Sequence, residues 1–324
     1  MARLIIATGL DRVIRHRPWL LKLMFRVESG VMHLVWWTLA ALSPDRAARV
    51  GAAMMRWAGP RTRKHAWVSG NLAIAFPERS EAELRSLARA TWSNIGSVGG
   101  EFPHLERIAL DGGGKRLELV DPCGLLPKYA ARERGAVFFS GHLSNWEINA
   151  LALVRAGVPL ISLYAGLQNE HLDALMGKAR AQLGCTMVSR DGSMRPVIKH
   201  LSEGGSLGVL ADLRVSGGMP IPFFGRDMNT SLVPARLALR HGCDLVPMRV
   251  ERLRPSCFRV TVHEPLDVPA LGSDDEQAIT LATAMSARIE EWIRERPGEW
   301  LCTNRRWAKS LYPHKQMAIR EDRQ

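Results

Sequence analysis

GAVFFSGHLSNWEIN, residues 135–149, reads as a buried strand that runs into a helix. The apolar run predicts a strand over Ala136–Ser140, and the polar residues after it predict a turn and then a helix from Asn145 to Ala156. His142 stands in the predicted turn, and Glu147 stands five positions later in the first helical turn. Two residues five apart on one helix point away from each other, whereas a turn histidine and a helical glutamate can converge.

The convergence of His142 and Glu147 predicts a base and its orienting carboxylate. The carboxylate would hold one imidazole nitrogen while the other nitrogen faces a substrate hydroxyl. Ser140 and Gly141 are small enough to let that substrate approach closely. The alternative interpretation is a turn histidine that caps the helix, because a histidine near a glutamate often occurs by chance.

Strand-like and helix-like segments alternate through the rest of the chain. Further strands are expected over Val158–Tyr164, Cys185–Ser189, Ser206–Ala211, and an antiparallel pair at Asp244–Leu253 and Cys257–His263. Further helices are expected over residues 81–96, 169–183, 196–203, 232–241 and 274–296. This alternation is typical of the α/β class. We therefore expect a mixed central sheet flanked by helices.

The charge balance points to an anionic partner. The chain has 44 Lys and Arg against 32 Asp and Glu, a formal net charge of +12. That charge suits nucleic acid, a phospholipid surface, a phosphorylated glycolipid or an acidic carrier protein. Ten tryptophans against three tyrosines favour a membrane interface, where an apolar ring with one polar edge fits the headgroup region.

Several classes of site are not expected. The five cysteines lack metal-binding spacing, and their odd number argues against a disulfide framework, so a reducing, cytoplasmic setting fits best. The sequence has no Walker loop and no histidine cluster with metal-ligand spacing. We therefore expect neither a metal nor another cofactor.

Residues 1–66 differ from the rest of the chain. Basic residues precede the charge-free run Ser29–Leu42, which at 14 residues is shorter than a bilayer span of about 20. Because Trp36 and Trp37 accompany these basic flanks, we interpret the run as an interfacial helix or short anchor rather than an ordinary buried helix. We divide the chain into membrane-associating helices (1–66), an α/β domain (67–312) and a polar tail (313–324).

A loop rich in Gly and Pro is a candidate substrate wall. It contains Phe223 and Phe224, followed by Gly225 and Arg226. The phenylalanines could line an acyl channel while the arginine meets a negative headgroup. The alternative is a surface loop that two phenylalanines pin to the core.

Two basic clusters are further candidates. Arg180 and Arg190 could bind phosphate or polarise a carbonyl oxygen, or they belong to a solvated basic face. The tail segment 297–309 alternates tryptophan with cationic residues that include Arg306. Such a segment suits an anionic lipid interface or single-stranded nucleic acid, or it docks on the core through its tryptophans.

Taken together, these segments resemble the bacterial lipid A biosynthesis acyltransferases, the lauroyl/myristoyl transferase group, and their phosphatidylinositol mannoside acyltransferase relatives. The resemblance runs from about Arg61 to Lys309 and rests on four motifs: Asn71–Glu78 (NLAIAFPE), Gly141–His142 with Trp146–Glu147, Gly217–Arg226 and on to Thr230, and Trp300 with Arg305–Trp307. Their order along the chain makes the resemblance specific. One departure is Asp212–Leu213, where many relatives have Asp-Gln.

The resemblance implies a glycerolipid-acyltransferase-like enzyme on the cytoplasmic face of the bacterial inner membrane. It would move a fatty acyl chain from acyl carrier protein or acyl-CoA to a hydroxyl of an anionic glycolipid, a lipid A precursor. His142 would be the general base and Glu147 its orienting partner, with Asn145 and Trp146 shaping the box. Phe223, Phe224, Gly225 and Arg226 would help to build the acceptor and acyl site, and Arg180, Arg190 and Arg306 would bind substrate.

Two other functions stay open on the sequence. One is an acyltransferase for a different acceptor, such as a lysophospholipid, a phosphatidylinositol mannoside or an amino lipid. The other is a non-catalytic basic protein that binds membranes or nucleic acid. The second is disfavoured because the basic residues are spread through a folded α/β pattern without a recognition motif, so no nucleic-acid partner is expected.

Overall fold

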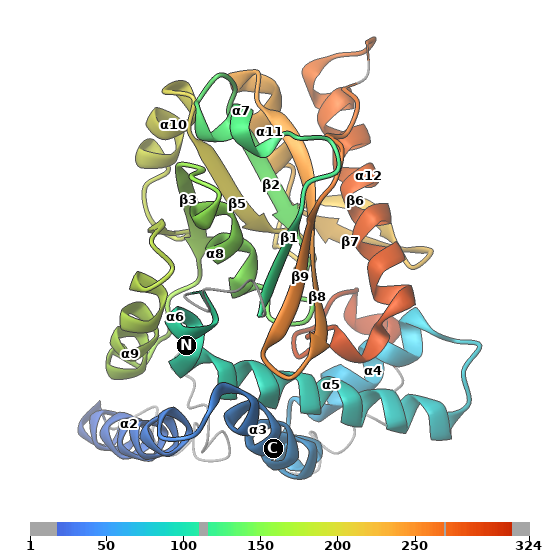
Figure 1. Cartoon of the computed structure of the whole chain (residues 1–324). Coiled ribbons are helices and arrows are strands. Elements are labelled where there is room, and N and C mark those ends of the chain that lie inside the picture. The colour runs from blue at the N-terminus through green and yellow to red at the C-terminus, as the bar shows by residue number, and fades with distance from the viewer. Residues whose placement is uncertain (1–17, 110–115, 269, 313–324) are drawn as a thin grey trace.

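A seven-stranded mixed sheet forms the centre of the protein (Figure 1). The computed structural model describes residues 18–109, 116–268 and 270–312. The strand order is β1-β9-β8-β2-β5-β3-β4; β8 and β9 are antiparallel, and the other neighbouring pairs are parallel. The strands are β1 (Leu117–Val120), β2 (Ala136–Ser140), β3 (Leu160–Tyr164), β4 (Thr186–Ser189), β5 (Ser206–Leu210), β8 (Asp244–Arg254) and β9 (Cys257–Val262).

Helices cover both faces of this sheet, because alternate residues of the central strand are buried on opposite sides. Val137 and Phe139 of β2 belong to one apolar cluster, and Ala136 and Phe138 belong to another. The first cluster includes residues of α10 (Arg195–Ser202), α11 (Val233–His241) and α12 (Asp274–Glu295). The second includes residues of α6 (Leu105–Ala109), α7 (Leu126–Ala130), α8 (Glu147–Arg155) and α9 (Glu170–Ala181).

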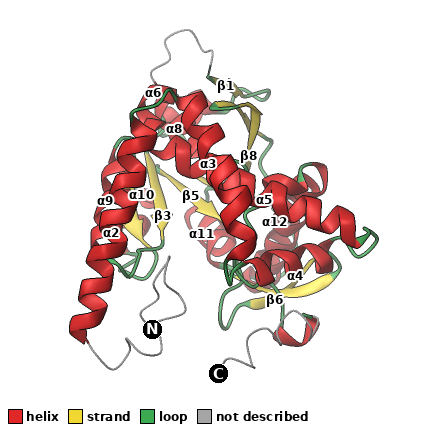
Figure 2. Ribbon diagram, turned by 90° about the horizontal axis from the view of Figure 1, so that it is seen from below, coloured by secondary structure: helices red, strands yellow, loops and turns green. Residues whose placement is uncertain are grey.

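Four N-terminal helices lie across the end of the molecule to which β2 points (Figure 1). They are α2 (Pro18–Ala40), α3 (Pro44–Ala58), α4 (His65–Ala75) and α5 (Glu81–Glu101). Seen from below, α2 and α3 form the near surface of this end, with α5 beside α3 (Figure 2). The carboxyl ends of β2 and of the strands that run in its direction, β3, β4, β5 and β8, therefore face these helices. Short 3-10 turns complete the chain at η1 (Gly59–Arg61), η2 (Phe102–His104), η3 (Pro297–Glu299) and η4 (Lys309–Leu311).

The predicted alternation of strands and helices is confirmed from β2 onward, with boundaries shifted by a few residues. The antiparallel pair is present as β8 and β9. Helix α5 begins at a capping box between Ser80 and Glu83, and α11 ends at Gly242, whose φ is 61°.

The sequence interpretation missed two features. Strand β1 was not predicted, and the Gly- and Pro-rich loop contains a hairpin of β6 (Met219–Phe223) and β7 (Arg226–Thr230). Phe224 and Gly225 form its two-residue turn with positive φ values of 52° and 67°, as a type I′ hairpin turn requires.

All but the last two residues of the N-terminal run lie within α2, which is neither fully exposed nor fully buried. Glu28, Ser29 and Leu39 are buried, whereas Leu34 and Trp37 are about 70 % exposed. Within the described ranges, every helix is too short or too polar to cross a bilayer. The predicted domain boundary at residues 66 and 67 falls inside α4, and the predicted tail at 313–324 lies outside the described residues.

Candidate active site

His142 lies in the turn after β2, next to a carboxylate from the neighbouring strand. Strands β2 and β5 are parallel neighbours, so their carboxyl ends meet at one edge of the sheet. Asp212 follows the end of β5, and its Oδ1 lies 2.6 Å from Nδ1 of His142. The same oxygen accepts a hydrogen bond from the His142 backbone N–H at 3.0 Å. Asp212 therefore fixes both the position of the turn and the orientation of the imidazole.

Asp212 is fully buried, and its second oxygen is also occupied. Oδ2 accepts hydrogen bonds from Trp300 Nε1 at 3.1 Å and from Arg306 Nη2 at 2.9 Å. Burial by itself raises the pKa of Asp212, but the charges and hydrogen bonds of His142 and Arg306 more than offset this effect. The net result is a pKa below the usual range, so the carboxylate stays ionised. An ionised acceptor at Nδ1 places the proton on that nitrogen and leaves Nε2 as the basic nitrogen.

The predicted contact between Glu147 and His142 is not the one that the structure forms. Glu147 accepts two hydrogen bonds at Oε1 from Arg180, at 3.1 Å from Nε and 2.8 Å from Nη2. The Arg180 guanidinium also lies 5.8 Å from the centre of the Tyr164 ring. Glu147 is the first residue of α8, and its carboxylate faces Arg180 of α9. Asp212 takes the place at Nδ1 of His142 that the sequence interpretation gave to Glu147.

A cavity of about 450 Å³ opens beside His142. Its size is within the range of small-molecule sites. Most of its wall comes from apolar residues of the sheet and of the helices on either face. Trp146 lines it with its ring centre 5.2 Å from that of His142, and the predicted binding residues Arg180 and Arg190 line it as well. The cavity therefore combines an apolar interior with cationic groups and one imidazole.

Two polar side chains in the wall of this cavity have no hydrogen-bond partner among the residues that the structure describes. The hydroxyl of Ser140, at the end of β2, is buried and unpaired, as are both polar atoms of the Asn149 amide on α8. Both residues line the cavity with His142. Leaving a buried polar group unpaired costs about 1–3 kcal/mol. These groups are therefore suited to receive a polar substrate atom, such as the oxygen of a carbonyl under attack.

Asn145 supports the catalytic turn from behind and does not line the cavity. Its amide donates to Glu101 Oε2 at 3.0 Å, and Glu101 is fully buried. Glu101 also pairs with Arg252 and accepts from the Ser256 backbone N–H at 3.2 Å. Burial raises the pKa of Glu101, and the Arg252 charge opposes that shift. The predicted binding role of Asn145 is thus replaced by a structural one.

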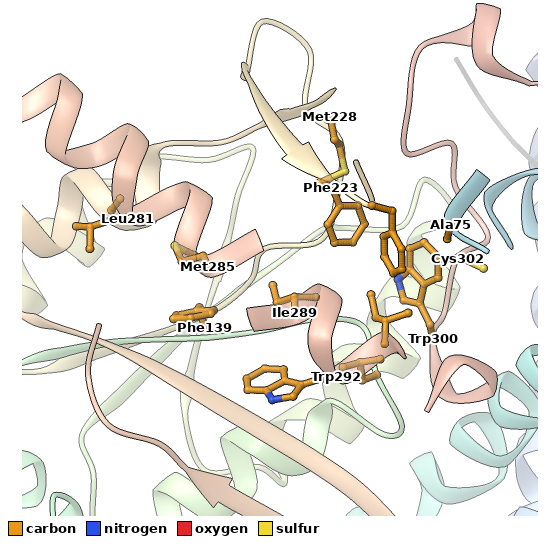
Figure 3. Packing of buried hydrophobic residues seen from close by; sticks show 14 of the residues in the cluster. Ala75, Phe139, Phe223, Met228, Leu281, Met285, Ile289, Trp292, Trp300 and Cys302 are labelled. Atoms are coloured by element: carbon orange, nitrogen blue, oxygen red, sulfur yellow. The ribbon is translucent and has the colours of Figure 1, made fainter. Parts of the chain in front are cut away.

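The hairpin and tail residues predicted to bind substrate lie away from the cavity. Phe223 and Phe224 are buried, with their ring centres 6.0 and 5.9 Å from that of Trp300 (Figure 3 shows Phe223 and Trp300 in this core). Gly225 and Arg226 are exposed at the hairpin turn. None of these residues is part of the described cavity wall, and the two phenylalanines pack in the core, as the alternative interpretation expects.

Arg306 is also buried in the core. Its charge pairs with Asp212, and its Nη1 donates to the Asn304 carbonyl at 2.9 Å. It therefore orients Asp212 and is not placed to contact a substrate, contrary to the prediction. Trp300 and Trp307 are buried too, so the tail docks through its tryptophans.

The sequence interpretation named Asp212 and Trp300 among the motif positions but did not predict that they contact His142 or each other. A signal for Asp212 is present in the sequence, since it stands directly after a predicted strand, as His142 does. Using that signal requires knowing that β5 lies beside β2, and no local pattern encodes this order.

Comparison with known proteins finds similarity to acyltransferases. A family model described as "Bacterial lipid A biosynthesis acyltransferase" matches residues 25–309. A phosphatidylinositol mannoside acyltransferase of Mycolicibacterium smegmatis is 26% identical over 210 residues, which cover 63% of this chain and 67% of that protein. Lipid A biosynthesis acyltransferase 2 of Shigella flexneri is 21% identical over 297 residues, or 84% and 89% of the two chains. A phosphatidylinositol mannoside acyltransferase of Mycobacterium tuberculosis is 25% identical over 191 residues, or 57% and 58%.

Proposed function

The chain is an acyltransferase of the bacterial lipid A biosynthesis acyltransferase family, and from this premise we propose that it transfers a fatty acyl chain from a thioester donor to a hydroxyl of an anionic glycolipid. The observation that carries the proposal is the pairing of the buried Asp212 with the partly exposed His142 at the wall of an apolar cavity. The donor is acyl carrier protein or acyl-CoA. The acceptor is a lipid A precursor on the cytoplasmic face of the inner membrane.

The reaction follows from the roles of the two nitrogens of His142. Asp212 holds the proton on Nδ1, and Nε2 accepts the proton of the acceptor hydroxyl. The hydroxyl oxygen attacks the thioester carbonyl to form a tetrahedral intermediate. When the C–S bond breaks, the imidazolium returns its proton to the leaving thiolate, which leaves as a thiol, and the new ester is released. General base catalysis of this kind typically supplies about 10²–10⁴-fold in rate.

The remaining groups of the cavity have complementary tasks. The apolar walls accept the acyl chain, while the unpaired Ser140 hydroxyl and Asn149 amide provide hydrogen bonds for the developing negative charge on the carbonyl oxygen. Glu147 keeps Arg180 in place at the wall, and Arg180 and Arg190 attract an anionic substrate. Glu147 thus acts through Arg180 in this proposal rather than through His142.

We also propose that the protein docks on the membrane with one face of α2 and α3. Exposed apolar side chains recur along α2 at helical spacing, at Trp19, Leu23, Val27, Val31, Leu34 and Trp37. Val50, Met54 and Trp57 continue this exposed apolar surface on α3. Tryptophans stand at both ends of the α2 stripe, as interfacial helices favour. The carboxyl ends of β2 and β5 point toward the same end of the molecule, which brings the cavity close to a lipid substrate (Figures 1 and 2).

Replacement of His142 tests the transfer reaction. The His142→Ala variant should lose acyl transfer at least about 10²-fold, because the base is absent. The assay is single-turnover transfer of a radiolabelled acyl chain from purified acyl carrier protein or acyl-CoA to extracted lipid acceptor. His171→Ala is the matched control, since His171 is an exposed side chain on α9. Wild-type turnover by a folded His142→Ala variant would refute the proposed mechanism.

The relatives supply a second candidate acceptor. Two of those compared are named phosphatidylinositol mannoside acyltransferases, and one is named a lipid A acyltransferase. Mass spectrometry of total lipids from a deletion strain separates the candidates. Loss of one acyl chain from lipid A supports the proposed acceptor, and an unchanged lipid A with an altered mannoside or other lipid points to the second.

A further inference from the structure

A second cavity, lined by arginines, lies on the other side of the catalytic turn. We call it the arginine groove; it has a volume of about 760 Å³ and follows one stripe of α5. Its floor consists mainly of small residues of that helix, and its walls carry five arginines, namely Arg56, Arg85, Arg89, Arg252 and Arg296. Among the described residues of its lining, the only acid is Glu299, which is paired with Arg296. The groove therefore carries a strong positive charge.

Part of this charge is free to bind a ligand. Arg252 is committed to the buried Glu101, and Arg296 to Glu251 and Glu299. Arg56 and Arg89, by contrast, form no ion pair with any acid in the described part of the chain, and Arg85 has one exposed partner. Guanidinium groups bind phosphate oxygens through paired hydrogen bonds. Ser86, Ser93 and Ser97 in the lining add hydroxyl donors.

The position of the groove indicates where such a ligand comes from. Arg56 stands on α3, the helix that also carries Met54 and Trp57 of the proposed membrane-docking face, and α5 lies beside α3 (Figure 2). Arginines beside an interfacial apolar surface lie at the depth of lipid headgroups. A concave site of this volume fits a headgroup rather than the broad surface of a partner protein.

We propose that the arginine groove binds the phosphate of an anionic lipid headgroup while α2 and α3 rest on the membrane. This site is distinct from the catalytic cavity, and the two share no described lining residue. The groove also adjoins the catalytic turn, because Asn94 in its floor donates to the carbonyl oxygens of Ser144 at 3.2 Å and Glu299 at 2.9 Å. A bound headgroup would thus hold the catalytic turn at a fixed distance from the bilayer.

The test compares two variants with the same loss of charge. Arg85→Gln/Arg89→Gln alters the groove, and Arg155→Gln/Arg240→Gln removes two exposed arginines of α8 and α11 that lie outside both the groove and the docking helices α2 and α3. Binding is measured by flotation with vesicles of phosphatidylcholine alone and with vesicles that also contain phosphatidic acid. We expect the groove variant to lose at least about tenfold in affinity for the anionic vesicles, and the control variant to lose clearly less. Binding to neutral vesicles should be equal in all three proteins.

Soluble probes separate the two sources of phosphate. Calorimetry with short-chain phosphatidic acid should detect binding that the groove variant loses, whereas inorganic phosphate alone should bind more weakly because it lacks the glycerol contacts. Equal losses of affinity for anionic vesicles in the two double variants would mean that the groove arginines contribute only general surface charge. That result would overturn the proposal. So would full retention of lipid binding with a loss of binding to an acidic carrier protein. Because the calorimetry needs neither acyl transfer nor membrane docking, its outcome is independent of the proposed function.

Discussion

The imidazole of His142 depends on a single carboxylate for its orientation and its protonation. Asp212 accepts from Nδ1 and from the backbone N–H of the same residue, so a change at Asp212 alters the base without removing it. In Asp212→Asn, the new amide can donate to Nδ1, which moves the ring proton to Nε2 and removes the lone pair that accepts the substrate proton. We expect kcat to fall by on the order of 10³–10⁴-fold with little change in KM.

Steady-state kinetics of the purified variant check this expectation. Asp227→Asn is the control, because Asp227 is an exposed acid on β7. A kcat within threefold of wild type in folded Asp212→Asn would show that the carboxylate does not set the tautomer.

The same carboxylate should make stability depend on pH. The pKa of Asp212 is lowered in the folded protein, since His142 and Arg306 outweigh the effect of burial, and in the unfolded chain it is about 3.9. The stabilising contribution of the ionised group is therefore complete above the unfolded pKa and is lost as the pH falls below it toward the folded pKa. Asp212→Asn should lower Tm most at pH 5–7, because it leaves Arg306 buried without its partner.

Thermal unfolding of both proteins from pH 7 to pH 3 measures this dependence. The difference in Tm should stay constant down to about pH 5 and narrow below about pH 4. A difference that stayed the same down to pH 3 would mean that folding does not lower the pKa of Asp212.

At the scale of single elements, the sequence predicts those that carry their own apolar pattern. Strand β2 and helix α12 fall within one residue of prediction, because a continuous apolar run and a capping box each act locally. Hairpin β6–β7 was not predicted, because Pro220 and Pro222 interrupt one strand and charged residues begin the other. Such a hairpin depends on packing against α12 and on its turn, which a pattern of hydrophobicity does not encode.

The contact between α3 and α5 gives the element-scale prediction. An added Cβ on Gly96 would lie 2.0 Å from the Gly51 carbonyl oxygen, so the two helices approach as closely as glycine allows. Gly96→Ala should force them apart and lower the free energy of unfolding by about 1–3 kcal/mol. Gly99→Ala on the same helix is the control, because nothing lies within 4 Å of its added Cβ. That change should raise stability by up to about 1 kcal/mol through helix propensity.

Chemical denaturation of the two variants provides the comparison. Equal stability of Gly96→Ala and Gly99→Ala would contradict the close helix contact.

At the scale of the whole molecule, the site depends on contacts between distant segments, which explains the limit of prediction from sequence. His142 and Glu147 form a local pair that a motif makes visible, and both do line the cavity. The residues that complete the site come from β5 and from the C-terminal segment, 70 positions or more away from His142. Their meeting follows from the order of strands in the sheet, in which β5 comes to lie between β2 and β3. The role assigned to Glu147 failed for that reason.

The proposed orientation on the membrane also belongs to this scale, since it requires two helices to present one apolar surface. Leu34 is 69% exposed on α2, and burying a leucine in lipid stabilises by about 1.5 kcal/mol or more. Leu34→Ser should therefore weaken binding to neutral phosphatidylcholine vesicles about tenfold. Leu271→Ser is the control, because Leu271 is 88% exposed in the loop before α12, away from α2 and α3.

The two variants are compared by vesicle flotation, with transfer to a short-chain acceptor in detergent as the test of an intact active site. Both should keep wild-type turnover in detergent, since neither residue lines the cavity. If Leu271→Ser reduced vesicle binding as much as Leu34→Ser, vesicle binding would depend on general surface hydrophobicity. The proposal that the protein docks through α2 and α3 would then be wrong. A selective loss in Leu34→Ser would instead fix the orientation in which the carboxyl ends of β2 and β5, and the cavity beside them, face the bilayer.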